Sequence, residues 1–252
     1  MKISVSTLGL YPAKIENILD FVTGLKLDYL EIITEYPYKH VTYDDVSNYD
    51  LGISVHAPMS DINIASHIDK IRDASNAEMV SAFRKANELD ANRVTVHPGS
   101  IPVMALKFTD KILEYNLESL KYLQSQAEEY GVMMCVENMP LLERLLYTNI
   151  EALYDLVDNE LHSGITLDVG HAHNNGFSVD EMFMSDSIHH IHLSDNDGSY
   201  DMHDALGTHN IDFEGIFNIL EKQRYDDICV IEVYSVNQIR KSVDYLKEIN
   251  VL

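Results

Sequence analysis

The sequence is poor in cysteine and in basic residues. Its two cysteines, Cys135 and Cys229, both lie in apolar runs, which excludes a disulfide framework and predicts buried, reduced thiols. Only 18 lysine and arginine residues face 41 aspartate and glutamate residues, for a formal net charge of −23. A surface of this charge repels phosphate backbones and anionic lipids unless bound cations or a local patch reverse the field.

Signals for a membrane, for export and for a second domain are also missing. No apolar run approaches the roughly 18 residues that a membrane span needs. Residues 1–5 enter a strand pattern directly, without the charged, apolar and cleavage segments of a signal peptide. We therefore expect a cytoplasmic protein without a membrane partner. No linker rich in proline, glycine or serine interrupts the chain, so residues 1–252 are expected to form one domain.

What the sequence does contain is a regular alternation of short β-rich runs and longer amphipathic stretches. Eight strands are expected, at Ile3–Ser6, Tyr29–Ile33, Ile53–His56, Val94–His97, Met133–Glu137, Gly164–Asp168, Ile188–His192 and Cys229–Val233. The clearest helical patterns are Ile68–Leu89, Thr109–Tyr130, Ile150–Leu156, Phe213–Lys222 and Val236–Ile249. The link 34–51 is expected to be a loop with at most a short helix, and 175–180 supports only a brief helix.

This alternation predicts parallel strands joined by right-handed crossovers. Eight such units in about 250 residues is the usual size of a closed (β/α)8 TIM barrel. A doubly wound open sheet is the alternative. Residues 7–11 after the first strand, however, lack the G-x-G-x-x-G spacing of a phosphate-binding loop. The α/β class with a single TIM barrel is therefore the predicted fold.

Ligand-capable side chains recur at the ends of the predicted strands. They are His56, His97, Glu137, Asp168, His171, His192, Asp201, His203 and Glu232. In a barrel these ends converge on the face that carries the active site. Alone, such a histidine is more often a hydrogen-bonded core residue, and such an aspartate a helix cap. Together, five histidines and four carboxylates would repel one another without cations. Imidazole and carboxylate ligands suit zinc, manganese, iron or cobalt, so the joint pattern predicts a metal site.

Several of these runs resemble the xylose-isomerase-like TIM barrel superfamily, which includes endonuclease IV and many sugar-phosphate isomerases and epimerases. The matching runs are His56-Ala57-Pro58, His97-Pro98-Gly99-Ser100, Val136-Glu137-Asn138, Asp168-Val169-Gly170-His171, His192-Leu193-Ser194-Asp195, the segment 201–207 and Ile231-Glu232. The resemblance implies a common metal held by Glu137, Asp168, His192 and Glu232. The two further zinc ions of endonuclease IV match His56 and His97, which share Glu137, and His171, Asp201 and His203.

Two chemistries fit this resemblance. The first is a metal-dependent isomerase or epimerase of a sugar, sugar phosphate or related polyol, with Glu137 and Glu232 moving the proton of an ene-diolate. The second is a phosphodiesterase like endonuclease IV, with a trinuclear zinc site and DNA as its partner. The low count of basic residues and the run 61–66 favour the isomerase, whereas the number of candidate ligands favours the phosphodiesterase. Zinc is expected if several ions bind, and manganese, magnesium or cobalt are alternatives if one does. A barrel that only stores or senses metal is disfavoured, because the active faces of TIM barrels are overwhelmingly catalytic.

Other polar residues near these ends are candidates for supporting roles. Asn138 and Asp195 are candidates for orienting Glu137 and His192, since metal ligands need such partners, and a turn-forming role is the equal alternative for Asn138. His173 and His209 lie in loops of the same face and are candidates for substrate contact. His190 shares the inward strand face with His192, where it is either a supporting group or simply a buried, hydrogen-bonded side chain.

Overall fold

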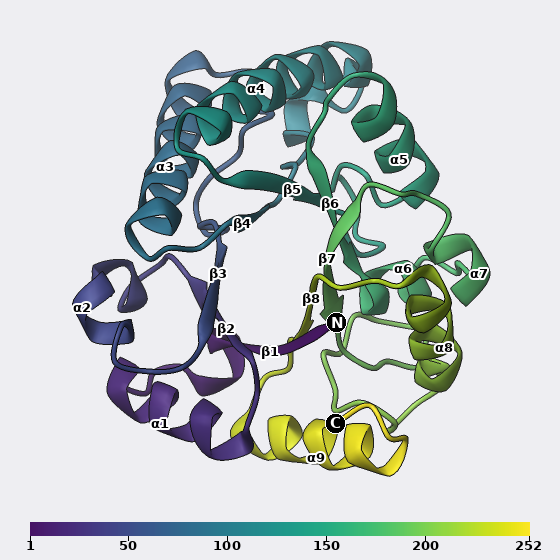
Figure 1. Ribbon diagram of the computed structural model, residues 1–252. Coiled ribbons are helices and arrows are strands. Elements are labelled where there is room, and N and C mark those ends of the chain that lie inside the picture. The colour runs from purple at the N-terminus through teal and green to yellow at the C-terminus, as the bar shows by residue number, and fades with distance from the viewer.

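The computed structural model describes all residues 1–252 and confirms the TIM barrel. Eight parallel strands follow one another around a closed barrel, and β1 pairs with β8 to complete the ring (Figure 1). The strands are β1 Lys2–Ser6, β2 Tyr29–Ile33, β3 Gly52–His56, β4 Arg93–Val96, β5 Met133–Glu137, β6 Gly164–Asp168, β7 Ile188–Leu193 and β8 Ile228–Ile231. All eight expected strands are present, with ends that shift by at most two residues.

Helices form an outer ring around the barrel (Figure 1). The longer ones are α1 Ile15–Leu25, α3 Asp69–Glu88, α4 Thr109–Glu129, α5 Ile150–Asn159, α8 Phe213–Gln223 and α9 Val236–Glu248. Short helices are α2 Tyr43–Val46, α6 Val169–Asn174 and α7 Val179–Met182, with 3-10 turns η1 Thr7–Leu10, η2 Tyr38–His40 and η3 Val103–Ala105. The link 34–51 thus carries only η2 and α2, as expected. Helices α1 and α6 were not among the expected helices.

The core lies between the strands and this ring. Helices cover the outer face of the barrel, so the side chains that point outward from the parallel strands are apolar. Leu30, Val55 and Val96 are fully buried and pack in one hydrophobic cluster with Leu19 and Phe83 of the surrounding helices. Both cysteines are buried and free, as their apolar neighbours predicted. The carboxyl ends of the strands are thereby held in a rigid ring.

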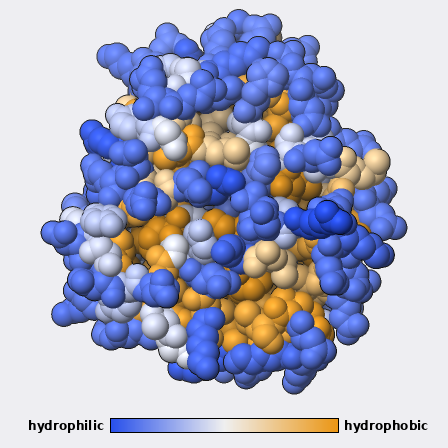
Figure 2. All heavy atoms as spheres, in the orientation of Figure 1, coloured by the Kyte–Doolittle hydropathy of each residue, from blue (hydrophilic) through white to orange (hydrophobic).

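The opposite end of the barrel is closed by polar contacts. Arg93 at the start of β4 donates to Asp227 at 2.8 Å, and Asp227 also lies 3.0 Å from Nδ1 of His189. Met1 and Val251 line one surface hollow, which places the two chain ends near each other. In the same orientation, hydrophilic side chains predominate on the surface and hydrophobic ones gather in separate patches (Figure 2). None of the helices is both long enough and apolar enough to cross a membrane.

Candidate active site

The structure brings all nine predicted ligands to the carboxyl ends of the strands. They form three groups, in each of which the ligand atoms lie within 4.8 Å of one another. The inner cluster is Glu137, Asp168, His192 and Glu232; the first outer cluster is His56, His97 and Glu137; and the second outer cluster is His171, Asp201 and His203.

The inner cluster is assembled from four strand ends, at β5, β6, β7 and β8. Nδ1 of His192 is its centre: it lies 3.0 Å from Oε1 of Glu137 and 3.1 Å from Oε2 of Glu232. Oδ2 of Asp168 is 3.9 Å away. All four side chains are buried. Burial opposes ionisation of Glu137, but His192 and His97 lower its pKa well below the ordinary value. Burial raises the pKa of Asp168 to about 6.

Glu137 also joins the inner cluster to the first outer cluster. While Oε1 faces His192, Oε2 lies 2.9 Å from Nε2 of His97 and 3.5 Å from Nε2 of His56. A carboxylate with its two oxygens aimed at separate groups of nitrogens has the arrangement of a bridging ligand. Burial lowers the pKa of His56, but Glu137 more than offsets this effect and raises it to about 9.

The second outer cluster lies on the other side of Asp168. Oδ2 of Asp201 is 3.3 Å from Nε2 of His171 and 3.2 Å from Nε2 of His203. Burial lowers the pKa of both histidines, but the neighbouring carboxylates raise it to about 10 for His171 and about 9 for His203. The second outer cluster is thus also an acid–imidazole group that is nearly shielded from water.

Three of the outer histidines are held by backbone carbonyls. Nδ1 of His56 lies 2.7 Å from the carbonyl oxygen of Ala57, that of His171 lies 2.8 Å from Asn138, and that of His203 lies 2.9 Å from Glu232. A carbonyl accepts only from a protonated Nδ1, which leaves Nε2 as the lone-pair nitrogen. Metal-ligating histidines are oriented in this way.

These residues fit divalent cations. Oε2 of Glu137, Oδ2 of Asp168 and Oδ1 of Asp201 are buried carboxylate oxygens that accept no hydrogen bond. Buried polar atoms are rarely left in this state, because removing a charged oxygen from water without a partner is strongly unfavourable. Each cluster has at least one such oxygen, from Asp168 in the inner cluster, from Glu137 in both the inner and the first outer cluster, and from Asp201 in the second outer cluster. The donor set of imidazoles and carboxylates suits zinc or another first-row metal.

A glycine makes the turn after β6 possible. Asp168 caps α6 by accepting a hydrogen bond from the backbone N–H of His171 at 2.7 Å. Gly170, between them, packs so tightly against β7 that an added Cβ would lie 2.5 Å from Oγ of Ser194 and 3.2 Å from Oδ1 of Asp168. Only a residue without a side chain therefore allows Asp168 and His171 to face separate clusters across one turn.

The structure shows what the expected supporting residues contact. Asn138 pairs with the backbone of Asp168, donating to its carbonyl at 2.9 Å and accepting from its N–H at 2.7 Å, so it positions β6 against β5. Asp195 accepts hydrogen bonds from backbone N–H groups of residues 196, 209 and 211. It therefore holds its own loop together and makes no hydrogen bond to His192. His209 pairs with Asp204 at 2.8 Å, and His173 lies on α6 beside Gly198.

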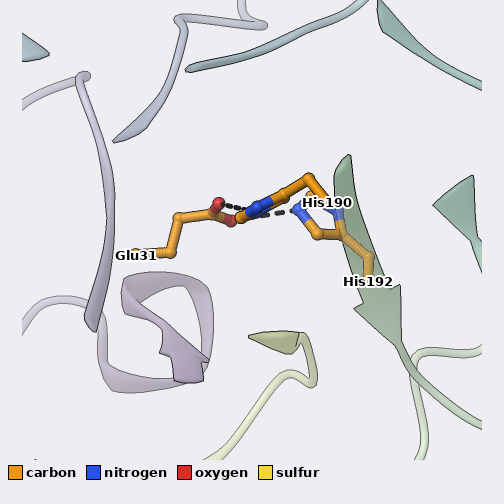
Figure 3. Close-up of side chains that lie close together, drawn as sticks. All are labelled: Glu31, His190 and His192. Carbon is orange, nitrogen blue, oxygen red and sulfur yellow. Dashed lines mark hydrogen bonds and ion pairs between the residues drawn. The ribbon is translucent and has the colours of Figure 1, made fainter. Parts of the chain in front are cut away.

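One buried acid near the inner cluster escaped the sequence analysis. Glu31 of β2 is fully buried inside the barrel, 2.7 Å from Nε2 of His190 and 3.2 Å from Nε2 of His192 (Figure 3). Burial raises its pKa, but the two histidines lower it far more. Its position could have been noticed in the sequence, because Glu31 is a charged residue within the otherwise apolar run of β2, and a buried charge needs a partner. His190 is buried and hydrogen-bonded to Glu31.

Two hollows adjoin the clusters on the same face. One of about 170 Å³ is lined by His97 with mostly apolar residues, including Met59 and Met139. The other, of about 270 Å³, lies between the loops after β1 and β2 and also includes Met59. Tyr11 and Tyr36 line it and are 61% and 74% exposed. Both hollows are smaller than the roughly 300–1,000 Å³ of typical ligand pockets.

Comparison with known proteins identifies the class. The family model for the xylose isomerase-like TIM barrel matches residues 44–249, so the chain belongs to this family. It is also 32% identical, over 98% of its length and 89% of the relative, to an uncharacterized protein of Methanocaldococcus jannaschii.

A solved structure described as a D-tagatose 3-epimerase-like protein superimposes with a TM-score of 0.88 at 31% identity, covering 100% of this chain and 97% of that one. A probable endonuclease 4 of Mycoplasmoides gallisepticum is 26% identical over 87% of this chain and 76% of the relative. The two relatives represent the two chemistries that the sequence left open.

Proposed function

We propose that this protein is a divalent-metal-dependent isomerase or epimerase of a sugar, sugar phosphate or related polyol. The observation that carries the proposal is the meeting of Glu137 and Glu232, from strands β5 and β8, on the single nitrogen Nδ1 of His192. The similarity to a D-tagatose 3-epimerase-like protein over the full chain supports it.

The proposed chemistry needs one carboxylate on each face of the substrate. A divalent ion in the inner cluster would polarise adjacent oxygens of a ketose and so acidify the neighbouring C–H bond. One glutamate accepts that proton, the electron pair of the C–H bond forms a C=C bond, and the π pair of the carbonyl moves onto its oxygen to give an ene-diolate. The other glutamate, which carries a proton at the start of the reaction, then gives it to the opposite face of the same carbon, or to its neighbour, and a C=O bond re-forms. No electrons are gained or lost overall.

Isotope exchange tests this proposal. We expect the metal-loaded protein to incorporate deuterium from D2O, next to the carbonyl carbon, into at least one of D-tagatose, D-psicose, D-fructose and their phosphates. Glu137→Gln and Glu232→Gln should each lower the rate at least ~10²-fold, the usual contribution of a general acid or base. Glu160→Gln is the matched control, because Glu160 is exposed and pairs only with Lys121 on the surface.

Exchange by Glu160→Gln should equal that of the wild type. If no ketose in this set exchanges, or if the two glutamine variants at the inner cluster exchange at the wild-type rate, the proposed chemistry is wrong.

A specific observation favours phosphodiester hydrolysis as a second candidate. The two outer clusters are preformed around Glu137 and Asp201, although proton transfer at a sugar carbon needs only the inner cluster. Their presence and the similarity to a probable endonuclease 4 support a three-ion site for phosphoryl chemistry. The net charge of −23 opposes a DNA substrate.

The variant His97→Ala separates the two candidates. It removes a ligand of the first outer cluster and leaves the four inner residues unchanged. Under the isomerase proposal, deuterium exchange persists in this variant and an abasic-site DNA duplex is not cleaved by the wild type. Metal-dependent nicking at catalytic rates that disappears in His97→Ala would establish the second candidate instead.

A further inference from the structure

The ring of His192 has different hydrogen-bonding partners from the outer-cluster histidines that contact backbone carbonyls. Those three rings, of His56, His171 and His203, are fixed through Nδ1 by backbone carbonyls and present Nε2. His192 does the reverse: its Nδ1 faces the inner carboxylates, and its Nε2 faces Oε1 of Glu31 at 3.2 Å. No backbone carbonyl supports it, so a side chain on another strand takes that place.

Glu31 is itself fixed from the far side. Its Oε2 lies 2.7 Å from Nε2 of His190 and accepts a weaker bond from Oγ of Ser54 at 3.3 Å. Neither Oε1 of Glu31 nor Nε2 of His192 makes a hydrogen bond, but the two buried atoms lie 3.2 Å apart as an ion pair and have no other partner. Figure 3 shows the carboxylate facing both rings, with both contacts drawn. The three side chains are fully or almost fully buried, so water does not compete for them.

We propose that Glu31, held by His190, is a positioning residue that keeps the proton of His192 on Nε2 and so leaves Nδ1 as the metal-binding atom of the inner cluster. A carboxylate accepts a hydrogen bond from Nε2–H and cannot donate one, so it selects this tautomer. Its charge also makes the imidazole a stronger ligand. The proposal rests on the inner site of the proposed function.

Glu31→Gln tests the role with little change of shape. A glutamine amide can turn its NH2 group toward Nε2 of His192, which favours the opposite tautomer and puts the proton on Nδ1. We expect the affinity for Co²⁺, measured by calorimetry on the stripped protein, to fall 10- to 100-fold, the usual effect of losing such a partner. The visible absorption of the bound cobalt should change as well.

Two matched variants serve as controls. Ser54→Ala removes a hydrogen bond from the same carboxylate without touching His192, and we expect its Co²⁺ affinity to stay within about twofold of the wild type. His190→Gln keeps an N–H donor for Oε2 of Glu31 and should weaken binding less than Glu31→Gln. Circular dichroism and melting of the metal-free proteins show whether each variant folds.

Nitrogen NMR of the zinc-loaded protein gives the readout that a merely structural role would not change. The wild type should show His192 with a protonated Nε2 and a metal-bound Nδ1, and a folded Glu31→Gln should lose this pattern. Unchanged affinity and an unchanged pattern in Glu31→Gln would refute the positioning role while leaving the proposed function intact. A wild type that binds no metal would instead overturn both.

A third result would also overturn the positioning role. If Glu31 and His190 held an ion of their own, Glu31→Gln would release one ion per chain without weakening the remaining ones.

Discussion

The tight turn between Asp168 and His171 gives a prediction whose size follows from the structure. In Gly170→Ala, the new methyl group would lie 2.5 Å from Oγ of Ser194, far inside normal contact. Relief requires the Ser194 side chain to turn away or its backbone, directly after β7, to shift, and overpacking of this kind lowers the free energy of unfolding by ~1–3 kcal/mol. At roughly 2–4 °C per kcal/mol for a chain of this size, the melting temperature should fall by ~2–12 °C. Metal affinity should fall with it, because Ser194 is two residues from His192.

Two further variants make this prediction refutable by thermal melting. Gly24→Ala is the matched control: nothing lies within 4 Å of an added Cβ in this exposed position of α1, so the same substitution should raise stability by ~0.5–1 kcal/mol. Ser194→Ala removes the opposing oxygen, which makes no hydrogen bond. The double variant Gly170→Ala/Ser194→Ala should therefore recover most of the loss. Equal melting temperatures for Gly170→Ala and the wild type, or no recovery in the double variant, would refute the steric explanation.

Three other outcomes follow from the same contacts. Added Zn²⁺ at about 100 times its Kd should stabilise the stripped protein by ~2.7 kcal/mol; an unchanged melting temperature would speak against a folded-state metal site. Without metal, the pKa values of His56, His171 and His203 are raised from 6.5 to about 9, 10 and 9. The protonated histidines therefore stabilise the folded protein fully below pH 6.5, and this contribution is lost as pH rises through 9–10. Urea unfolding between pH 6.5 and 10 measures this loss, and a constant or rising free energy of unfolding would contradict it. Asp227→Asn, at the other end of the barrel, should lower stability by ~1 kcal/mol and leave metal binding unchanged, as melting and calorimetry on one sample can check.

Most of the barrel could be predicted because its strands are short, apolar and separated by periodic helices. Helix α1 was missed although Ile18, Leu19 and Val22 are buried at helical spacing, so its sequence did carry a signal. Helix α6 is only six residues long and follows the capping Asp168, too short for a periodic pattern to show.

The candidate ligands could be found for a different reason. Most of them lie at the end of an apolar run, and parallel strands in a barrel bring those ends together, so their proximity follows from topology. Asp201 and His203 lie further along, in the loop after β7, where topology alone does not place them. The contact between Glu31 and His192 depends on which layer of the barrel interior each side chain fills, because β2 and β7 are not neighbours in the ring. The roles of Asn138 and Asp195 likewise depend on loop conformation, which residue type does not fix.

Metal content is the most direct test of the central claim, that the inner cluster holds a divalent cation. The wild-type protein should retain at least one zinc, manganese or cobalt ion per chain after dialysis against that metal and removal of the excess. Asp168→Asn removes an inner ligand that neither outer cluster uses, and this variant should retain one ion fewer than the wild type. A wild type that retains no ion, or an Asp168→Asn protein with the full wild-type content, would contradict the account.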